Sequence, residues 1–132
     1  MAECFQFVCS SCGFSVQAWD DGNPYIQFPG LRKRHYFYHP SGEQMVLEIG
    51  RKHFGREPNS AEVDQMHREW GGNASEHLCR ECGAIRRLDP HKDRIQCSKC
   101  KSAHVVDILS ISGMRCIRCE GTFLEGTGIA VS

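Results

Sequence analysis

The chain has 132 residues and a mass of 14.9 kDa, a size at which one hydrophobic core normally carries the fold. Its 16 Lys and Arg residues balance 16 Asp and Glu residues, and eight thiolates around two divalent ions would bring the net charge to about −4, so strong attraction of the whole chain to a polyanion is not expected. Nine cysteines, with no recognisable signal peptide or transmembrane segment, predict a reduced, cytoplasmic protein that binds metal rather than forming disulfides and has no membrane partner.

Residues 5–19 predict two short strands on either side of a cysteine turn. After the cysteines, Phe14, Val16 and Ala18 alternate with Ser15, Gln17 and Trp19, which is the period of a half-buried strand. The sequence DDGNP at 20–24 is typical of a turn, and YIQF at 25–28 resumes as a strand. A further strand is expected in LRKRHYFYH at 31–39, which is basic first and then aromatic, and which ends at Pro40.

The segment 41–55 predicts a first helix. Ser41 can cap it, Gln44 would complete a capping box, and Gly55 is the expected stop. A second helix follows, with Asn59 or Ser60 as its cap, and its expected end is at Gly71. Because a short Pro-containing link joins the two, they predict a helical hairpin inserted between metal-binding halves.

Eight of the nine cysteines form CxxC pairs, in which two residues separate the members. Such a gap lets a tight turn direct both sulfurs at one point, and two turns complete a tetrahedral site. Four pairs in one reduced chain therefore predict two Cys4 metal sites. The ninth, Cys4, is expected to be a buried spare thiol, with a reactive or metal-linked role as the alternative. The paired residues are Cys9 with Cys12, Cys79 with Cys82, Cys97 with Cys100, and Cys116 with Cys119.

The segment 79–107 resembles the zinc-ribbon (rubredoxin-like) family, in which cysteine turns at the tips of β-hairpins hold one zinc ion. The resemblance rests on CRECG, then on CSKC after fourteen residues, then on SAHVVDI, and it extends less fully to 5–19 and 112–126. It implies a zinc site at the second and third pairs, with Gly83 as the glycine that follows the turn. Lys101 and Glu120 occupy this glycine position in two other turns, and the proline often found inside the CxxC is missing. In rubredoxins, which bind iron through four cysteines, the second cysteine turn is similar to CPxCG. Neither CSKCK nor CIRCE matches this motif, so zinc is favoured over iron.

The four pairs can combine as neighbours, interleaved or nested. Spacings of fourteen and fifteen residues make both the second with the third pair and the third with the fourth pair plausible ribbons. Pairing the third with the fourth would leave both glycines in the other site, whereas pairing the second with the third gives each site one glycine, so the nested arrangement is preferred. It joins Cys9 and Cys12 with Cys116 and Cys119, and a metal site can offset the cost of closing so long a loop, since that cost grows only logarithmically with length.

These features predict a small α+β, metal-stabilised fold with two zinc-ribbon Cys4 β-knuckle sites and an inserted helical hairpin. A single compact domain, 1–132, would comprise an outer ribbon from 1–40 plus 112–132, the hairpin at 41–72 and a central ribbon at 77–111. Val16, Val105, Val106, Ile108 and Ile111 are expected in the core, together with Phe14.

No enzymatic activity is expected. Catalytic zinc keeps a coordination position open for water, whereas each site here has four cysteines, so two structural Zn²⁺ ions are predicted as the cofactors. No histidine sits with a nucleophile in a recognisable motif. His53 and His67 fall on helical stripes and are expected to be partly buried, and the complete cysteine count makes His77 unnecessary as a ligand.

Function by binding is therefore expected, and a protein partner ranks first, with the chain acting as an adaptor or inhibitor. Phe54, Met66 and Trp70 suit an interface, unless they seal the hairpin onto the ribbon. Nucleic-acid binding is the alternative and thiol redox sensing ranks third; the sequence leaves the oligomeric state open. The residues favouring nucleic acid are the cations Arg32, Lys33, Arg34 and His35 beside the rings Tyr36, Phe37 and Tyr38, with a second patch on the ribbon that includes Arg86 and Arg87.

Overall fold

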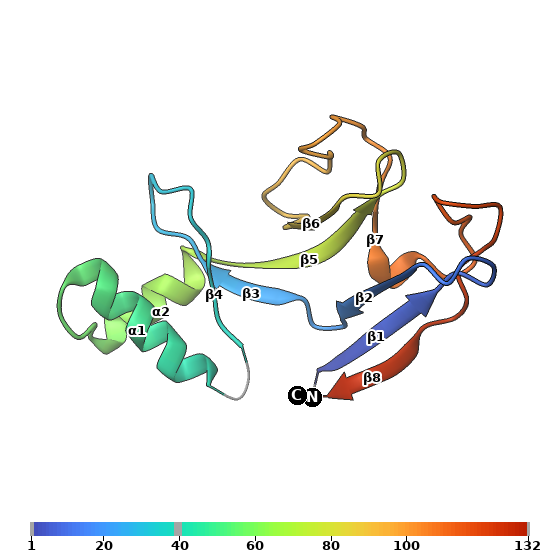
Figure 1. The fold of residues 1–132 in the computed structure, drawn as a ribbon. Helices are drawn as coiled ribbons and strands as arrows, with labels where there is room; N and C mark the ends of the chain where they lie inside the picture. The colour runs from blue at the N-terminus through green and yellow to red at the C-terminus, as the bar shows by residue number, and fades with distance from the viewer. Residues whose placement is uncertain (1, 39–40, 132) are drawn as a thin grey trace. The chain divides into compact units, whose positions relative to one another are not determined.

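The computed structural model describes residues 2–38 and 41–131, and its elements are drawn in Figure 1. The chain divides into two compact units. Residues 1–22 and 75–132 form the first, which we call the ribbon unit, and residues 23–74 form the second, the helical unit. The hairpin predicted at 41–72 falls within the helical unit. Neither helix of the described residues has the length and apolar character needed to cross a membrane.

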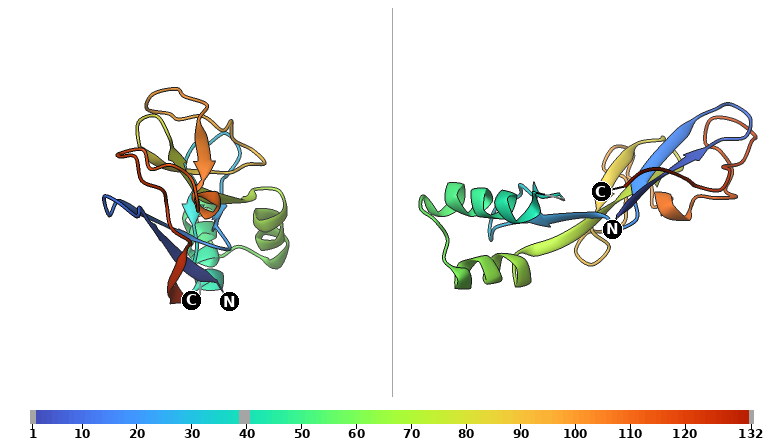
Figure 2. Two further views of the ribbon diagram at one scale, coloured as in Figure 1. Left: turned by 90° about the vertical axis from the view of Figure 1, so that its right-hand side faces the viewer. Right: turned by 90° about the horizontal axis from the view of Figure 1, so that it is seen from below.

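A three-stranded antiparallel sheet in the ribbon unit contains strands from both ends of the chain. Its order is β2-β1-β8, with β1 at Glu3–Val8, β2 at Ser15–Trp19 and β8 at Thr127–Val131. Strands β1 and β8 run side by side in Figures 1 and 2, and their register shifts between Cys4 and Phe5. The cysteine turn between β1 and β2 is confirmed at the predicted place.

The longest strand, β5 (Gly71–Cys79), contributes to both units. Its first residues pair with β3 (Asn23–Ile26) in the helical unit. Its later residues pair with β6 (Ile85–Leu88) and β7 (Val105–Asp107) in the ribbon unit, and a short 3₁₀ helix follows β7 at Ile108–Ser110. Asp107 caps this 3₁₀ helix by accepting a hydrogen bond from the Leu109 N–H at 2.9 Å.

The helical unit combines a hairpin of β3 and β4 (His35–Tyr36) with helices α1 (Gly42–Phe54) and α2 (Ser60–Arg68). Ile26, Phe28, Val46 and Met66 form its buried core. Phe37, Ile49, Phe54, Val63 and Trp70 pack against that core and complete it. The end of the strand predicted up to Pro40 lies outside the described residues.

The helix ends differ in part from the prediction. Asn59 caps α2 within a full capping box, and Gly55 ends α1 in the left-handed conformation, as predicted. The capping box expected at Ser41 is wrong, because its side chain makes no capping hydrogen bond. Gly71 does not end α2 either: the helix ends at Arg68, its C-cap is Glu69, and Gly71 begins β5.

The ribbon unit has a core of nine buried residues among those described, and two of them are cysteines. Val16, Ile108 and Ile111 are buried as predicted, whereas Phe14 and Val106 are only partly buried and pack against that core. Phe7, Ala18, Leu78 and Phe123 are buried with them, as are Cys9 and Cys116.

The expected partial burial of His53 and His67 is wrong, since both are exposed. Each still packs on a ring of the helical unit. His53 stacks on Phe28 with centroids 3.6 Å apart, and His67 meets Phe37 edge-on at 5.8 Å. A histidine ring can cover an apolar side chain while one edge stays in water, which is why helical spacing alone overestimated the burial.

Candidate metal centre

The outer sulfur group joins the two ends of the chain. The Sγ atoms of Cys9 and Cys119 lie 3.4 Å apart, and those of Cys12 and Cys116 lie 3.7 Å apart. All four sulfurs lie within 4.8 Å of one another. The first pair of the chain is therefore grouped with the fourth, as the nested arrangement requires.

The inner sulfur group lies at the tips of the β5–β6 hairpin and of the loop before β7. Cys79 and Cys100 have Sγ atoms 3.5 Å apart, and the corresponding distance between Cys82 and Cys97 is 3.6 Å. These four sulfurs also lie within 4.8 Å of one another. Both groups belong to the ribbon unit.

The spacing of the sulfurs fits a metal ion and does not fit a disulfide. With Zn–S distances of about 2.3 Å, a regular tetrahedron of sulfurs has an edge of about 3.8 Å, close to the spacings found here. A disulfide needs about 2.05 Å, and all nine cysteines are free. A closed set of four thiol sulfurs suits zinc or iron, and each group could hold one such ion.

All four cysteine turns are closed by the same backbone hydrogen bond. In each, the N–H of the first cysteine donates to the carbonyl five residues later, at 2.8 to 2.9 Å. This bond closes the turn and brings the second cysteine back toward the first. The pairs are Cys9 to Phe14, Cys79 to Ala84, Cys97 to Ser102, and Cys116 to Gly121.

The residue after the second cysteine takes a left-handed conformation in three of the four turns. Gly13 and Gly83 have φ of 77° and 80°, values that glycine adopts without strain. Lys101 has φ of 65° at the same place and is the non-glycine residue with positive φ in the described chain. Glu120 does not share this conformation, so the fourth turn closes in another way.

Each turn has one buried and one more exposed cysteine. The first cysteines, Cys9, Cys79, Cys97 and Cys116, are buried. The second ones face solvent: Cys12, Cys82 and Cys100 are exposed and Cys119 is half-buried. An ion held by each group would therefore lie at the boundary between the core and water, and it would connect the turns to that core.

Backbone amides favour the ionised form of two buried thiols. The pKa of Cys9 is lowered to about 6, first by the Cys12 amide and then by the Ser11 amide, whose nitrogen lies 3.4 Å from the sulfur. The pKa of Cys97 is lowered to about 6 in the same way, mainly by the Cys100 amide at 3.5 Å. These amides act as the anion-stabilising dipoles that a metal-binding turn supplies.

The second members of two turns show the opposite effect. A hydrogen bond from the Gly121 amide lowers the pKa of Cys119, but the neighbouring sulfur of Cys9, partial desolvation and the sulfurs of Cys12 and Cys116 outweigh it and raise the pKa to about 12. In Cys100 the amide of Ser102 is outweighed in the same way, and its pKa rises to about 12. Four converging sulfurs cannot all ionise without a cation between them, so metal binding and loss of the thiol protons are coupled.

The remaining candidate ligands lie outside both groups. His77 is buried, and its Nδ1 lies 2.8 Å from the Ser75 carbonyl oxygen. Cys4 is buried as predicted, and burial, followed by the charge of Glu76, raises its pKa. A raised pKa keeps this thiol protonated, which is typical of an inert structural cysteine.

The binding candidates of the helical unit divide between exposed cations and packed rings. Arg32 and Lys33 are exposed, whereas the Arg34 guanidinium lies 4.4 Å over the Tyr25 ring. His35 packs edge-on against Phe28 at 5.8 Å. Phe37 packs against the core, and the half-buried Tyr36 stacks with the exposed Tyr38 at 6.5 Å.

The ribbon candidates Arg86 and Arg87 are exposed on β6, and the Arg86 guanidinium donates to the Ser98 hydroxyl at 3.1 Å. They belong to a group of nine exposed cations between Cys79 and Cys119. The sequence analysis names Arg86 and Arg87 among them, and the sequence pattern does not predict that all nine face solvent. They are Arg80, Arg86, Arg87, Lys92, Arg94, Lys99, Lys101, Arg115 and Arg118.

Comparisons with protein families, with curated proteins and with solved structures found no match for this chain. Its functional assignment therefore depends on the sulfur geometry and the surface chemistry described above.

Proposed function

We propose that the protein is a non-enzymatic binding protein held in shape by two structural zinc ions. The observation that supports this function best is the pair of closed four-sulfur groups. Four protein sulfurs fill a tetrahedral site, so neither water nor substrate finds a coordination position there. The ions would bind to Cys9, Cys12, Cys116 and Cys119, and to Cys79, Cys82, Cys97 and Cys100.

The outer ion would tie the β1–β2 turn to a segment more than a hundred positions away along the chain. The two segments also share backbone hydrogen bonds, from the Ser10 N–H to the Thr122 carbonyl at 2.9 Å and from the Leu124 N–H to the Val8 carbonyl at 2.9 Å. Without metal, these bonds, the β1–β8 pairing and the shared core hold the ends together. A structural zinc site contributes on the order of 10 kcal/mol at neutral pH, which is comparable with the net stability of a whole domain.

Metal content tests the zinc proposal. We expect two zinc ions per purified chain, and one in the Cys119→Ser variant. Cys4→Ala is the matched control, because it removes a buried thiol that belongs to neither group, and it should retain two. Fewer than two ions in the native protein, or the red colour of an iron–thiolate site, would contradict the assignment.

A protein partner is our first proposal for the ligand, and β8 is the surface that favours it. This strand lies at the edge of its sheet. Its sequence TGIAV lacks the charged residues or proline that usually prevent an exposed edge strand from pairing with another chain. Ile129 and Val131 are 47% and 67% exposed, and Leu124 just before the strand is 54% exposed. An extended segment of another protein could add a strand here and cover these side chains.

The helices do not supply this surface. Met66 is completely buried in the helical core, and Phe54 and Trp70 pack against that core. The three side chains that could have met a partner thus stabilise the helical unit itself.

Capture from a native cell extract, with nuclease added to half of the sample, tests the partner proposal. We expect the captured material to survive nuclease and to be lost in Ile129→Lys, which places a charge on the edge strand. Ile85→Lys is the matched control, because Ile85 is an exposed isoleucine on another strand. Loss of the material on nuclease treatment would reverse the ranking in favour of nucleic acid.

Nucleic acid is the second candidate for the ligand. In the segment between Cys79 and Cys119, nine cations are exposed, whereas the acidic side chains interact with other groups of the protein. The Glu81 carboxylate pairs with His104 at 2.7 Å, and Asp107 caps the 3₁₀ helix. Asp89 is buried and accepts from the His91 N–H at 3.0 Å. The cations of this segment therefore dominate its surface, although the formal charge of the whole chain is zero.

A further inference from the structure

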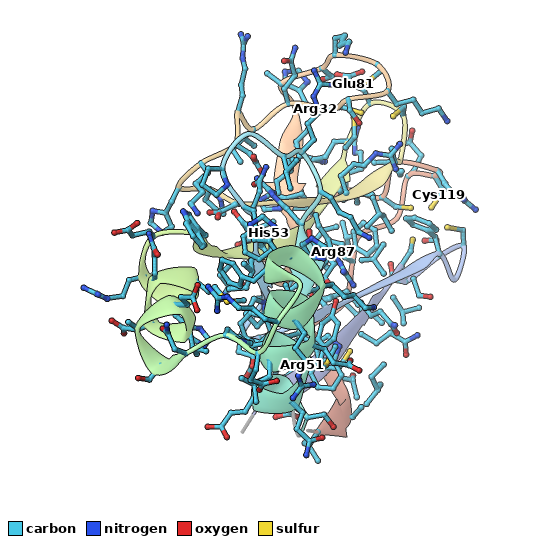
Figure 3. All side chains as sticks on the ribbon, turned by 90° about the vertical axis from the view of Figure 1, so that its left-hand side faces the viewer. Arg32, Arg51, His53, Glu81, Arg87 and Cys119 are labelled. Atoms are coloured by element: carbon cyan, nitrogen blue, oxygen red, sulfur yellow. The ribbon has the colours of Figure 1, made fainter. Side chains whose placement is uncertain are left out.

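We propose that the two metal centres bind their ions cooperatively, because a cysteine turn of the inner group packs against a cysteine turn of the outer group. The turn of Cys79 and Cys82, the second along the chain, belongs to the inner group, and the turn of Cys116 and Cys119, the fourth, belongs to the outer group. Glu81 and Cys119 mark these two turns in Figure 3. The inference rests on the two zinc sites proposed above and adds that each ion strengthens the binding of the other.

A first contact joins residues that directly follow a sulfur ligand of each group. Gly83 follows Cys82, and Ile117 follows Cys116. A Cβ atom at Gly83 would lie 2.7 Å from Ile117 Cδ1, so the isoleucine side chain lies directly against the Gly83 backbone. Such a close approach depends on the missing side chain of glycine. The end of the second turn is therefore part of the surface on which the fourth turn packs.

A second contact joins residues beside the first ligand of each turn. Arg80 follows Cys79, and Arg115 precedes Cys116. The Arg80 guanidinium donates a hydrogen bond to the Arg115 carbonyl oxygen at 3.2 Å, and both arginines are exposed. The second and fourth turns are thus joined at two places, and every residue that makes these contacts is one position away from a sulfur ligand.

The buried sides of the two turns share one core. Leu78, the residue before Cys79, is completely buried in the same core as Cys9 and Cys116 of the outer group. Ile117 is partly buried and packs against this core. Protein interiors are close-packed, so a displacement of the second turn would disturb the residues that surround the outer sulfurs.

An inner ion would fix the part of the second turn that makes the first contact. Pairing of β5 with β6 and β7 holds the base of this turn, and the bond from the Cys79 N–H to the Ala84 carbonyl closes it. At its tip, the exposed Cys82 has its sulfur 3.6 Å from that of Cys97 in the third turn. Thiolates this close repel each other unless a cation lies between them. We therefore expect the tip, with Gly83, to shift when the inner group is empty.

Repulsion between the two loaded centres acts in the opposite direction. Four thiolates around one divalent ion carry a net charge of about −2, so one loaded centre disfavours a second one nearby. Arg80, Arg115 and Arg118 lie in sequence beside or between the sulfur ligands, and all three are exposed. Their charges offset part of the repulsion, and dissolved salt screens much of the rest. The packing contacts then determine the sign, and the first ion favours binding of the second.

The zinc affinities of single-site variants test the proposal. Cys100→Ser removes an exposed ligand of the inner group, and Cys119→Ser removes a half-buried ligand of the outer group, so each variant keeps one complete group. The product of the two zinc affinities of the native protein should exceed the product of the two single-site affinities by about 5- to 150-fold, the usual range for linked sites. Competition of the full chain with a chromophoric zinc chelator measures all of these affinities.

Variants at the contacts then show whether the coupling passes between the two turns. Arg80→Gln combined with Ile117→Ala keeps all eight sulfur ligands, and it should still bind two zinc ions while its coupling factor falls toward one. Arg68→Gln combined with Ile85→Ala is the matched control, because it makes the same two chemical changes at exposed positions that form neither contact. The control should keep the coupling of the native protein.

The outcomes separate this inference from the proposed zinc sites. Two ions per chain that bind with independent affinities would refute the coupling and leave both structural sites in place. Fewer than two ions would contradict the sites themselves. Tighter binding by the single-site variants would mean that charge repulsion outweighs the contacts, which also overturns the proposal. If the Arg80 and Ile117 variant couples its centres as strongly as the native protein, the contacts between the turns do not transmit the effect, and the proposal is refuted.

Discussion

The two units of the molecule are stabilised by different means. In the helical unit, Ile26, Phe28, Val46 and Met66 form a continuous apolar core beneath two helices. In the ribbon unit, cysteines occupy core positions beside Phe7 and Leu78, and loops connect most of the strands. Hydrophobic burial can account for the first unit. The core of the second also contains Cys9 and Cys116, which belong to a candidate metal centre, so we expect the ribbon unit to depend on bound metal in addition to hydrophobic burial.

The difference also appears at the ends of the elements. Helix α2 begins with a full capping box at Asn59, and α1 ends at Gly55 with its N–H bonded to the Arg51 carbonyl at 2.9 Å. The ribbon unit instead repeats one five-residue backbone closure at four cysteine turns. The helical unit therefore has local structural signals of its own, and the ribbon unit has signals for metal binding.

Removal of metal should have the largest effect and should separate the two units. With a zinc site worth on the order of 10 kcal/mol, we expect chelation of both ions to unfold the ribbon unit and to leave the helical unit folded. The two tryptophans provide the measurement, because Trp19 lies in the ribbon unit and Trp70 in the helical unit. In Trp70→Phe, emission from Trp19 should shift to longer wavelength on chelation.

The complementary variant, Trp19→Phe, is the control. Its remaining Trp70 packs edge-on against Phe28 at 5.5 Å and should keep a native emission spectrum after chelation. If both tryptophans shift together, the helical core does not stand without metal. If neither shifts, the four-sulfur groups are not needed for the fold.

Local sequence patterns predicted the features that depend on neighbouring residues, such as the cysteine turns and the capping residue Asn59. The nested grouping joins distant residues, and it is found as preferred from the distribution of the glycines among the turns. The main omission is β5, whose sequence GGNASEHLC begins with two glycines and has few apolar residues. Its partners, β3, β6 and β7, are distant in sequence or short, and strand formation depends on such pairing more than on intrinsic preference.

Gly71 shows why a correct signal was assigned a wrong role. Glycine after a helical pattern predicts a helix end, but α2 has already ended when the chain reaches Gly71. A Cβ atom there would lie 2.3 Å from the His67 carbonyl oxygen. The position requires glycine because the returning strand passes close to the helix, and such a close approach leaves no periodic trace in the sequence.

Met66→Ala should give the next largest effect, on the helical unit alone. Met66 is completely buried, and such truncations cost about 2–5 kcal/mol. We expect unfolding followed through Trp70 to move to lower urea concentration while zinc content stays at two. Loss of zinc from this variant would show that the metal sites depend on the helical core, against the comparison drawn here.

Glycine substitutions at the cysteine turns should have intermediate effects on the ribbon unit. A residue with Cβ in the left-handed conformation costs about 1–2 kcal/mol, so Gly13→Ala should destabilise the unit by about that amount. Gly83→Ala should cost more, because its Cβ would also lie 2.7 Å from Ile117 Cδ1, whereas nothing lies within 4 Å of a Cβ at Gly13.

Lys101→Gly is the reverse experiment at the equivalent place of the third turn. Removing the left-handed strain should raise the stability of the zinc-loaded ribbon unit by about 0.5 kcal/mol after the entropic cost of glycine. Thermal unfolding of the zinc-loaded protein, followed through Trp19, measures all three variants. A loss of stability in Lys101→Gly would mean that the lysine side chain contributes more than its backbone costs.

The smallest expected effect concerns acid and the start of α2. A hydrogen bond from Arg56, followed by one from the Asn59 amide, lowers the pKa of Glu62 to about 2. An unfolded chain titrates Glu near pH 4.3, so the ionised carboxylate stabilises α2 above about that pH, and this contribution is lost as the pH falls from about 4.3 toward 2.

Glu62→Gln should therefore speed amide exchange in α2 several-fold at neutral pH, where the native carboxylate binds both partners. The difference between the native protein and the variant should shrink as the pH falls below about 4. Because acid also protonates the metal-binding thiolates, the readout must be the amides of α2 within the helical unit. A difference that persists unchanged at pH 3 would show that the charge of the Glu62 carboxylate is not its source.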